Sequence, residues 1–219
     1  MKKVKIALAA SALAVILAAC GGKQGSTSTF SPDQDSIFVS REGSFSSSLV
    51  ETYDSANYTQ EKFQTFVDDI VSSYNEGKGA GALSANAEGQ AKLPVAVKSC
   101  ILEGGAAKII FDYASGADLI EFAKDQQDAD NLAEGLEFGK ASTFLNQGAL
   151  MEAVFVTPKD GTNVKPEKLV KAGESSCVAV DGAVTIQTEG KIQYVSKGVS
   201  LQDDFTAKTP EGRSYIIFK

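Results

Sequence analysis

Carboxylates are the side chains of this sequence that could carry acid–base catalysis, because the chain contains no histidine. Its absence excludes Ser-His-Asp and Cys-His catalysis, histidine-ligated zinc and an imidazole pH switch. Two of Glu103, Asp112, Glu121 and Glu152 could form the carboxyl pair of a glycan hydrolase, about 5 to 9.5 Å apart. However, the chain has no tryptophan, and its aromatic residues are expected in the core, so a sugar-binding cleft is poorly supported. We expect no catalytic site, and a carboxylate-dependent cell-wall glycan hydrolase is the alternative.

Three short motifs resemble known sites but lack their essential residues. Residues 77–81, GKGAG, have neither the third glycine of G-x-G-x-x-G nor the Gly-Lys-Ser/Thr ending of a P-loop. Residues 173–177, GESSC, resemble a nucleophile elbow, but a cysteine replaces the last glycine and a strand is expected next. Residues 125–131, DQQDADN, cluster carboxylates without the spacing of an EF-hand loop. We therefore expect no cofactor site and no metal site.

The chain has three cysteines, Cys20, Cys100 and Cys177. Cys100 and Cys177 both fall in expected strands, with no histidine to activate them. Two thiols cannot complete a closed zinc site. On an oxidising cell exterior two alternatives remain. In the first alternative, Cys100 and Cys177 form a disulfide, which needs Cα atoms within about 7 Å. In the second, they are two separate buried cysteines.

Residues 1–19 have the features of a secretory signal peptide. Three lysines lie among the first five residues, and residues 6–19 are apolar except for Ser11. This apolar stretch is shorter than the roughly 20 residues of a membrane-spanning helix. The sequence LAACG over residues 17–21 resembles the lipobox of bacterial lipoproteins. That resemblance implies that Cys20 receives a diacylglycerol thioether and becomes the N-terminus after cleavage. A single acyl chain gives only marginal membrane binding, so durable anchoring takes two or more chains, such as palmitate.

The composition favours an outward-facing acidic protein that is held at the membrane by lipid. The net charge is −7, and removal of residues 1–19 would take away three lysines and no acidic residue. The acidic charge therefore argues against nucleic acid as a partner and against attachment to lipid headgroups through basic residues. Residues 20–35, rich in glycine, serine and threonine, predict a flexible tether. Residues 36–219 are long enough for one extracytoplasmic domain.

The clearest expected helix covers residues 59–77. Its apolar residues follow the spacing i, i+3, i+4, i+7, i+8 and i+11, which predicts one apolar face. They are Phe63, Phe66, Val67, Ile70, Val71 and Tyr74. Thr59 is a good N-cap, and residues 77–94 predict a surface loop or a subdomain linker. Shorter helices are expected over 117–133 and 141–147.

Alternating residues predict strands in the remaining segments. Hairpins are expected around residues 41–43 and around the pair Gly104-Gly105. After residue 166 a meander is expected, with turns at Asp181-Gly182, Glu189-Gly190 and Glu211-Gly212. The predicted fold class is α+β, an antiparallel sheet or meander with one clear amphipathic helix and one or two shorter helices.

The stretches SIFVSREGSF, VKSCILEGGAAKIIFDY and GKIQYVSKGVSL resemble uncharacterised lipoproteins of Gram-positive, clostridia-like anaerobes. The resemblance covers most of the mature chain and rests on turn and strand patterns, so it carries no active site. It implies a cell-membrane lipoprotein that faces outward. We expect a non-catalytic binding or scaffolding role, with an envelope protein or a cell-wall component as the partner.

Overall fold

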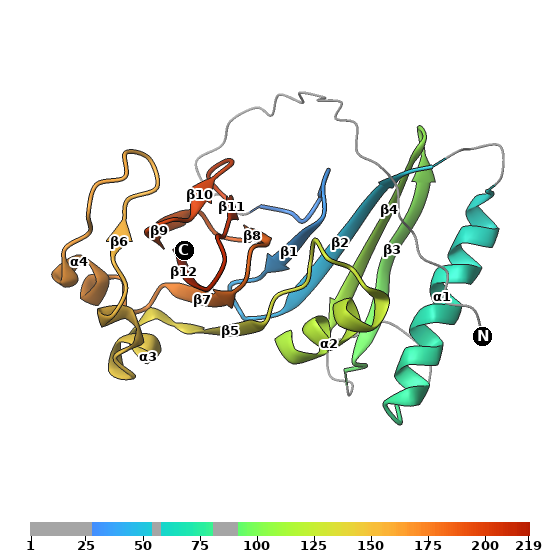
Figure 1. Cartoon of the computed structure of the whole chain (residues 1–219), viewed down its shortest axis with the longest axis horizontal. Coiled ribbons are helices and arrows are strands. Elements are labelled where there is room, and N and C mark those ends of the chain that lie inside the picture. The colour runs from blue at the N-terminus through green and yellow to red at the C-terminus, as the bar shows by residue number, and fades with distance from the viewer. Residues whose placement is uncertain (1–27, 54–57, 81–91) are drawn as a thin grey trace.

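The computed structural model describes residues 28–53, 58–80 and 92–219. Two sheets form its centre, with helices at both ends of the long axis (Figure 1). The seven-stranded sheet contains, in spatial order, β10 (Ser200–Leu201), β11 (Thr206–Lys208), β8 (Thr185–Thr188), β1 (Ser36–Val39), β2 (Phe45–Thr52), β4 (Ala106–Tyr113) and β3 (Val95–Glu103). The five-stranded sheet contains β5 (Gly135–Lys140), β7 (Ser176–Asp181), β12 (Arg213–Phe218), β9 (Ile192–Ser196) and β6 (Phe155–Val156).

The helices are α1 (Gln60–Gly77), α2 (Gly116–Gln126), α3 (Ala141–Asn146), the 3₁₀ helix η1 (Ala149–Met151) and α4 (Pro166–Lys171). The predicted α+β fold class is confirmed. Paired strands in the described part of the chain are antiparallel, with one exception: β1 lies parallel to β8. This parallel pair joins the two halves of the sequence within one sheet.

The two expected hairpins of the first half are confirmed. β1 pairs with β2 across the turn that contains Gly43, and β3 pairs with β4 across Gly104-Gly105. Gly104 and Gly105 have φ values of 60° and 82°. A two-residue turn with positive φ at both central positions matches the twist of antiparallel strands, and glycine adopts it without steric cost.

The expected meander of the second half is wrong. Asp181-Gly182 lies between β7 and β8, Glu189-Gly190 lies between β8 and β9, and Glu211-Gly212 lies between β11 and β12. In each case the two strands belong to different sheets, so the chain crosses from one sheet to the other instead of forming a hairpin. The acid–glycine pairs do reverse the chain, but the strand that pairs next depends on which face must be buried.

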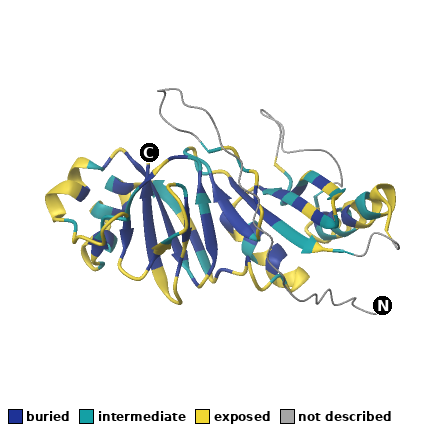
Figure 2. Ribbon diagram, turned by 90° about the horizontal axis from the view of Figure 1, so that it is seen from above, coloured by how far each residue is buried: buried dark blue, intermediate teal, exposed yellow. Residues whose placement is uncertain are grey.

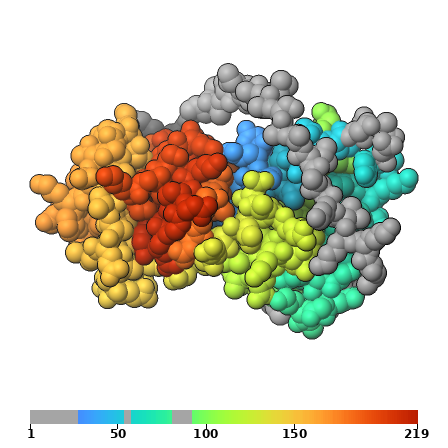
Figure 3. All heavy atoms as spheres, in the orientation of Figure 1, coloured from blue at the N-terminus to red at the C-terminus, as the bar shows by residue number. Residues whose placement is uncertain are grey.

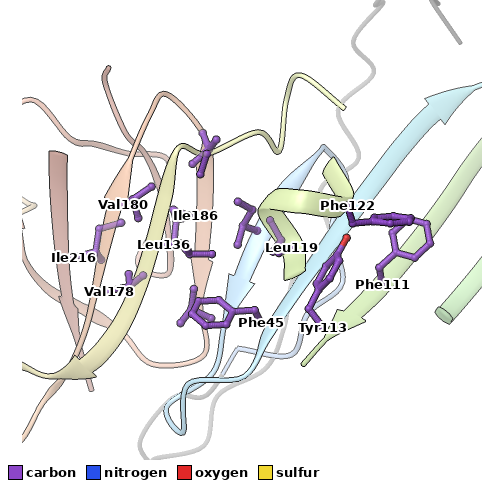
Figure 4. Packing of buried hydrophobic residues seen from close by; sticks show 14 of the residues in the cluster. Phe45, Phe111, Tyr113, Leu119, Phe122, Leu136, Val178, Val180, Ile186 and Ile216 are labelled. Carbon is purple, nitrogen blue, oxygen red and sulfur yellow. The ribbon is translucent and has the colours of Figure 1, made fainter. Parts of the chain in front are cut away.

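The main apolar cluster lies between the sheets and continues beneath α2 (Figure 4). Val67 and Val71 of α1 also belong to it. Val178 and Ile216 contribute to it from the five-stranded sheet, and Ile186 from the other. Phe122 of α2 packs edge-on against Phe111 of β4, with ring centroids 5.1 Å apart. The strands around this cluster are the most buried part of the molecule (Figure 2). This cluster therefore combines residues from both sheets and from both halves of the sequence.

A second apolar cluster covers the opposite face of the five-stranded sheet. Along β7, Val178 and Val180 point into the first cluster, whereas Cys177 and Ala179 point into the second. α3, η1 and α4 cover this second face with Phe144, Leu150 and Leu169. Because both of its faces are covered, β7 is a continuous apolar run instead of an alternating one.

Two helices differ from the sequence prediction. α2 ends at Gln126, and Gln127 adopts a left-handed conformation with φ 59°, so the expected helix over 117–133 is too long. α4 was not predicted, because six residues give too little periodic pattern, although Pro166 at its first turn is a favourable start. The expected helices over 59–77 and 141–147 are confirmed as α1 and α3.

Residues 28–35, expected to be the second half of the flexible tether, lie against the folded body. The Ser28 amide donates to the Glu189 carbonyl, and Gln187 donates to the Ser28 hydroxyl. Phe30 stacks on Phe38, with ring centroids 4.9 Å apart. Pro32 is buried. The composition predicted coil but concealed these anchoring residues, and the prediction of a tether is wrong over 28–35. Residues 20–27 lie outside the described residues.

Candidate functional site

Helix α1 is held along the free edge of β3 by two side-chain amides. Near the start of α1, Gln60 Nε2 donates to the Cys100 carbonyl (2.8 Å) and its Oε1 accepts from the Leu102 amide (2.7 Å). Near the end, Asn75 Nδ2 donates to the Val95 carbonyl (2.8 Å) and its Oδ1 accepts from the Val95 amide (3.2 Å). The two amides thus replace a neighbouring strand and satisfy an otherwise open sheet edge.

Because α1 lies along the edge of β3, only a narrow stripe of the helix surface is buried. Val67, Val71 and Asn75 are buried, and Phe63, Ile70 and Tyr74 are partly buried beside them. Phe66 is 44% exposed, so its predicted place on the buried face is wrong. At about 100° per residue, Phe66 lies about 140° around the helix from Val71. The edge of one strand does not cover so wide an arc.

The exposed side of α1 forms one wall of an open groove of about 560 Å³, and the end of α2 forms the other. Figure 3 shows α2 in yellow-green near the teal end of α1. Phe66, Ile70 and Tyr74 supply its apolar and aromatic surface. The two helices meet at Tyr74, whose ring contacts Phe122 of α2 edge-on, with centroids 5.0 Å apart. Apolar walls with a few polar groups are typical of small-ligand or side-chain binding sites. This groove is the candidate functional site.

The charged residues of the groove are mainly acidic. Asp69 from α1 and Asp125 from α2 line it, and neither forms an ion pair with a described residue. Lys78 also lines it, but its ammonium group is bound to the Glu121 carboxylate and lies 5.5 Å from the centre of the Tyr74 ring. The hydrogen bond to Glu121 raises the pKa of Lys78. Among the described residues, the groove therefore has two carboxylates that form no ion pair, although Asp125 accepts a hydrogen bond from the Gln126 side chain.

The carboxylates considered for glycan hydrolysis do not form a pair. Six residues separate Asp112 from Ala106, the partner of Glu103, so Asp112 and Glu103 lie about 20 Å apart. Asp112 forms an ion pair with Lys98 and points away from the sheet face that α2 covers. Glu121, on α2, forms an ion pair with Lys78 at the end of α1. Glu152 lies at the other end of the molecule, next to η1.

A different group of carboxylates is brought together by the fold. Burial and, to a smaller extent, the charges of Asp128, Asp130 and Glu51 together raise the pKa of Asp35 to about 6, although the hydrogen bond from the Val50 amide lowers it. Burial also raises the pKa values of Glu51 and Asp128. Asp35 accepts a hydrogen bond from the Val50 amide (2.6 Å). None of these residues lines the α1–α2 groove. These acidic residues come from segments far apart in the chain, so no local sequence pattern indicates that they lie close together.

The loop that carries Asp128 is attached to β2 through Asn131. Asn131 is fully buried, and its Nδ2 donates to the Ser48 carbonyl and to Asp128 Oδ2, both at 2.9 Å. Asp128 thus has a structural role in closing the turn after α2. Among the residues that the structure describes, no group of three or more acidic or cysteine side chains is arranged to hold a metal ion.

The possible disulfide between Cys100 and Cys177 is not formed. Both thiols are free and buried, Cys100 on β3 of the seven-stranded sheet and Cys177 on β7 of the five-stranded sheet. They belong to separate apolar clusters. Burial raises the pKa of Cys100 to about 11 and that of Cys177 to about 12, so both remain protonated thiols. The second alternative, two separate buried cysteines, is the one found.

Cys20, the expected lipidation site, lies outside the described residues, as does most of the expected loop or linker over 77–94. No helix in the described ranges is long and apolar enough to cross a bilayer. Comparison with family models, curated proteins and solved structures gives no match.

Proposed function

We propose that this chain is a bacterial lipoprotein, anchored through Cys20 to the outer face of the cell membrane, and that its folded body binds a component of the envelope without catalysis. The lipobox-like sequence over residues 17–21 supports the anchor. The observation that carries the binding role is the α1–α2 groove, because it exposes Phe66, a large apolar side chain, in an open concave surface.

The separation of the groove from the perturbed carboxylates supports binding over hydrolysis. A glycan hydrolase needs two carboxyl groups that face each other across the substrate. Asp35 and Asp128, whose pKa values are raised, lie outside the groove and are occupied by hydrogen bonds to Val50 and Asn131. A carboxylate-dependent cell-wall hydrolase remains the alternative, favoured only by the raised pKa of Asp35. Loss of glycan-cleaving activity in Asp35→Asn would support that alternative.

The anchor is tested by metabolic labelling with a fatty acid. The wild-type chain should incorporate the label, whereas Cys20→Ser should not and should retain residues 1–19. Incorporation of the label into Cys20→Ser would contradict the lipoprotein assignment.

The binding role is tested by pull-down of the acylated protein from intact envelopes, with both glycan and protein detection. Phe66→Ala should lose most of the captured material. Val170→Ala is the matched control, because Val170 is an exposed apolar residue (66%) on α4, at the other end of the molecule. Equal capture by the two variants would exclude the groove as the binding surface.

A further inference from the structure

We infer that the α1–α2 groove recognises a cationic side chain, a lysine or arginine on a peptide segment of the partner. This inference rests on the proposed binding function and specifies its ligand. The aromatic and apolar residues Phe66, Ile70 and Tyr74 can pack against the aliphatic stem of such a side chain. Asp69 and Asp125 supply negative charge where its head would lie.

The first support is charge complementarity. Asp69 and Asp125 are exposed on two different helices, line the same groove and form no ion pair with a described residue. Lys78, the lysine that lines the groove, is already bound to Glu121. A neutral or anionic ligand would leave both aspartates uncompensated, whereas a lysine or arginine would neutralise them. Complementary charge of this kind selects among partners and speeds their encounter.

The second support is the environment of the Lys78 ammonium group. Lys78 Nζ lies 5.5 Å from the centre of the Tyr74 ring and binds the Glu121 carboxylate. An aromatic face combined with a carboxylate is a favourable environment for a cation. Phe66 and Asp69 bring an aromatic ring and a carboxylate together earlier on α1, and neither contacts a cationic side chain among the described residues. The groove thus contains one occupied cation position and a similar unoccupied set of side chains.

The test uses the full chain, reconstituted in phosphatidylcholine vesicles, which carry no net charge. The probe is a fluorescent glycine–serine peptide with four lysines, and fluorescence anisotropy reports binding. The same peptide with acetylated lysines is the matched ligand control. Wild type should bind the lysine peptide at least about tenfold more tightly than the acetylated one, and binding should weaken as salt rises from about 0.05 to about 0.5 M.

The variants separate charge from apolar contact. Asp69→Asn/Asp125→Asn should weaken binding of the lysine peptide about tenfold, and Phe66→Ala about fivefold. Glu174→Gln/Glu211→Gln removes the same charge from exposed positions outside the groove and should stay within about twofold of wild type. These residues are exposed, and circular dichroism checks that each variant is folded.

Equal binding of the two peptides, or equal loss in the two double variants, would overturn the inference. In the second case only the overall negative charge would attract the peptide. The proposed function fails separately. If the peptide does not bind but envelope capture still depends on Phe66, the groove is a binding site for a ligand that is not cationic.

Discussion

The two ends of the molecule both use helices to cover an apolar surface, with opposite results. At the five-stranded sheet, α3, η1 and α4 lie over a sheet face and leave Cys177 and Ile217 fully buried. At the seven-stranded sheet, α1 lies along the edge of β3 and leaves Phe66 in contact with solvent. A helix on a sheet face can bury a wide stripe, whereas a helix on an edge buries only the residues that face one strand. The first arrangement closes a core beneath the helices, although Met151 and Val170 on their outer side remain exposed, and the second leaves Phe66 exposed beside the groove.

The largest expected effect is at the closed end. Phe155 is almost fully buried in the second cluster, so Phe155→Ala should lower the free energy of unfolding by about 3–5 kcal/mol. Urea denaturation measures the change. A loss below about 1 kcal/mol would mean that this end is not a tightly packed core.

Asn75→Ala tests how α1 is attached. The substitution removes both hydrogen bonds to Val95, whose backbone groups would then be buried without partners, and it should cost about 2–3 kcal/mol. Gln60→Ala is the comparison, because it removes an exposed hydrogen bond to Leu102 and a partly buried one to Cys100, and this loss should cost about 1 kcal/mol. Denaturant unfolding measures both variants, and an equal cost would argue against a buried amide at position 75.

Asp35 should make stability depend on pH. Its pKa is raised from 3.8 to about 6, so the folded state binds the proton more tightly, and the associated stability is lost as pH rises through about 6. Because Asp35 is partly exposed, solvent screening reduces this effect. Between pH 4 and pH 7.5 the free energy of unfolding of the wild type should fall by about 1 kcal/mol relative to that of Asp35→Asn. Unfolding curves across this range measure the difference. A constant difference between the two proteins would contradict the raised pKa.

Phe66→Ala should have a small effect on stability. Its ring is half in solvent, so the free energy of unfolding should change by less than about 1 kcal/mol, although envelope capture is expected to fall. Thermal denaturation and the pull-down, run on the same preparation, separate the two effects. A loss of several kcal/mol would place Phe66 in the core, as the helical pattern alone predicts.

The thiols of Cys100 and Cys177 should not affect stability or react with reagents while the chain is folded. Cys100 and Cys177 are buried and unpaired, so a reductant should leave the melting temperature unchanged, and a thiol reagent should react with neither residue in the folded protein. With Cys20 acylated, the denatured and unreduced protein should give two titratable thiols. Any smaller number would indicate a bridge.

Local patterns predicted α1 and the Gly104-Gly105 hairpin, because residues within one turn or one helix determine them. They could not predict the acidic cluster, since Asp35, Glu51 and Asp128 meet only after the strands pair. The sheet to which β8 belongs also depends on its distant partner, β1. One signal was present for the attachment of α1. Asn75 follows Val67 and Val71 on the centre of the apolar face, and a polar residue there indicates a buried hydrogen bond.

The contact between residues 28–35 and the body determines how far a lipid-anchored protein of this kind could reach. Seven residues lie between Cys20 and Ser28, and the eight Cα-to-Cα steps of a fully extended chain span at most about 29 Å. Ser28 is fixed beside β8, whereas α1 lies at the far end of the long axis (Figure 1). With Cys20 in the bilayer, the body would search only a thin layer above the membrane, where the effective concentration of a partner on the same membrane is on the order of millimolar. Even a groove with low affinity for its partner could then be occupied most of the time.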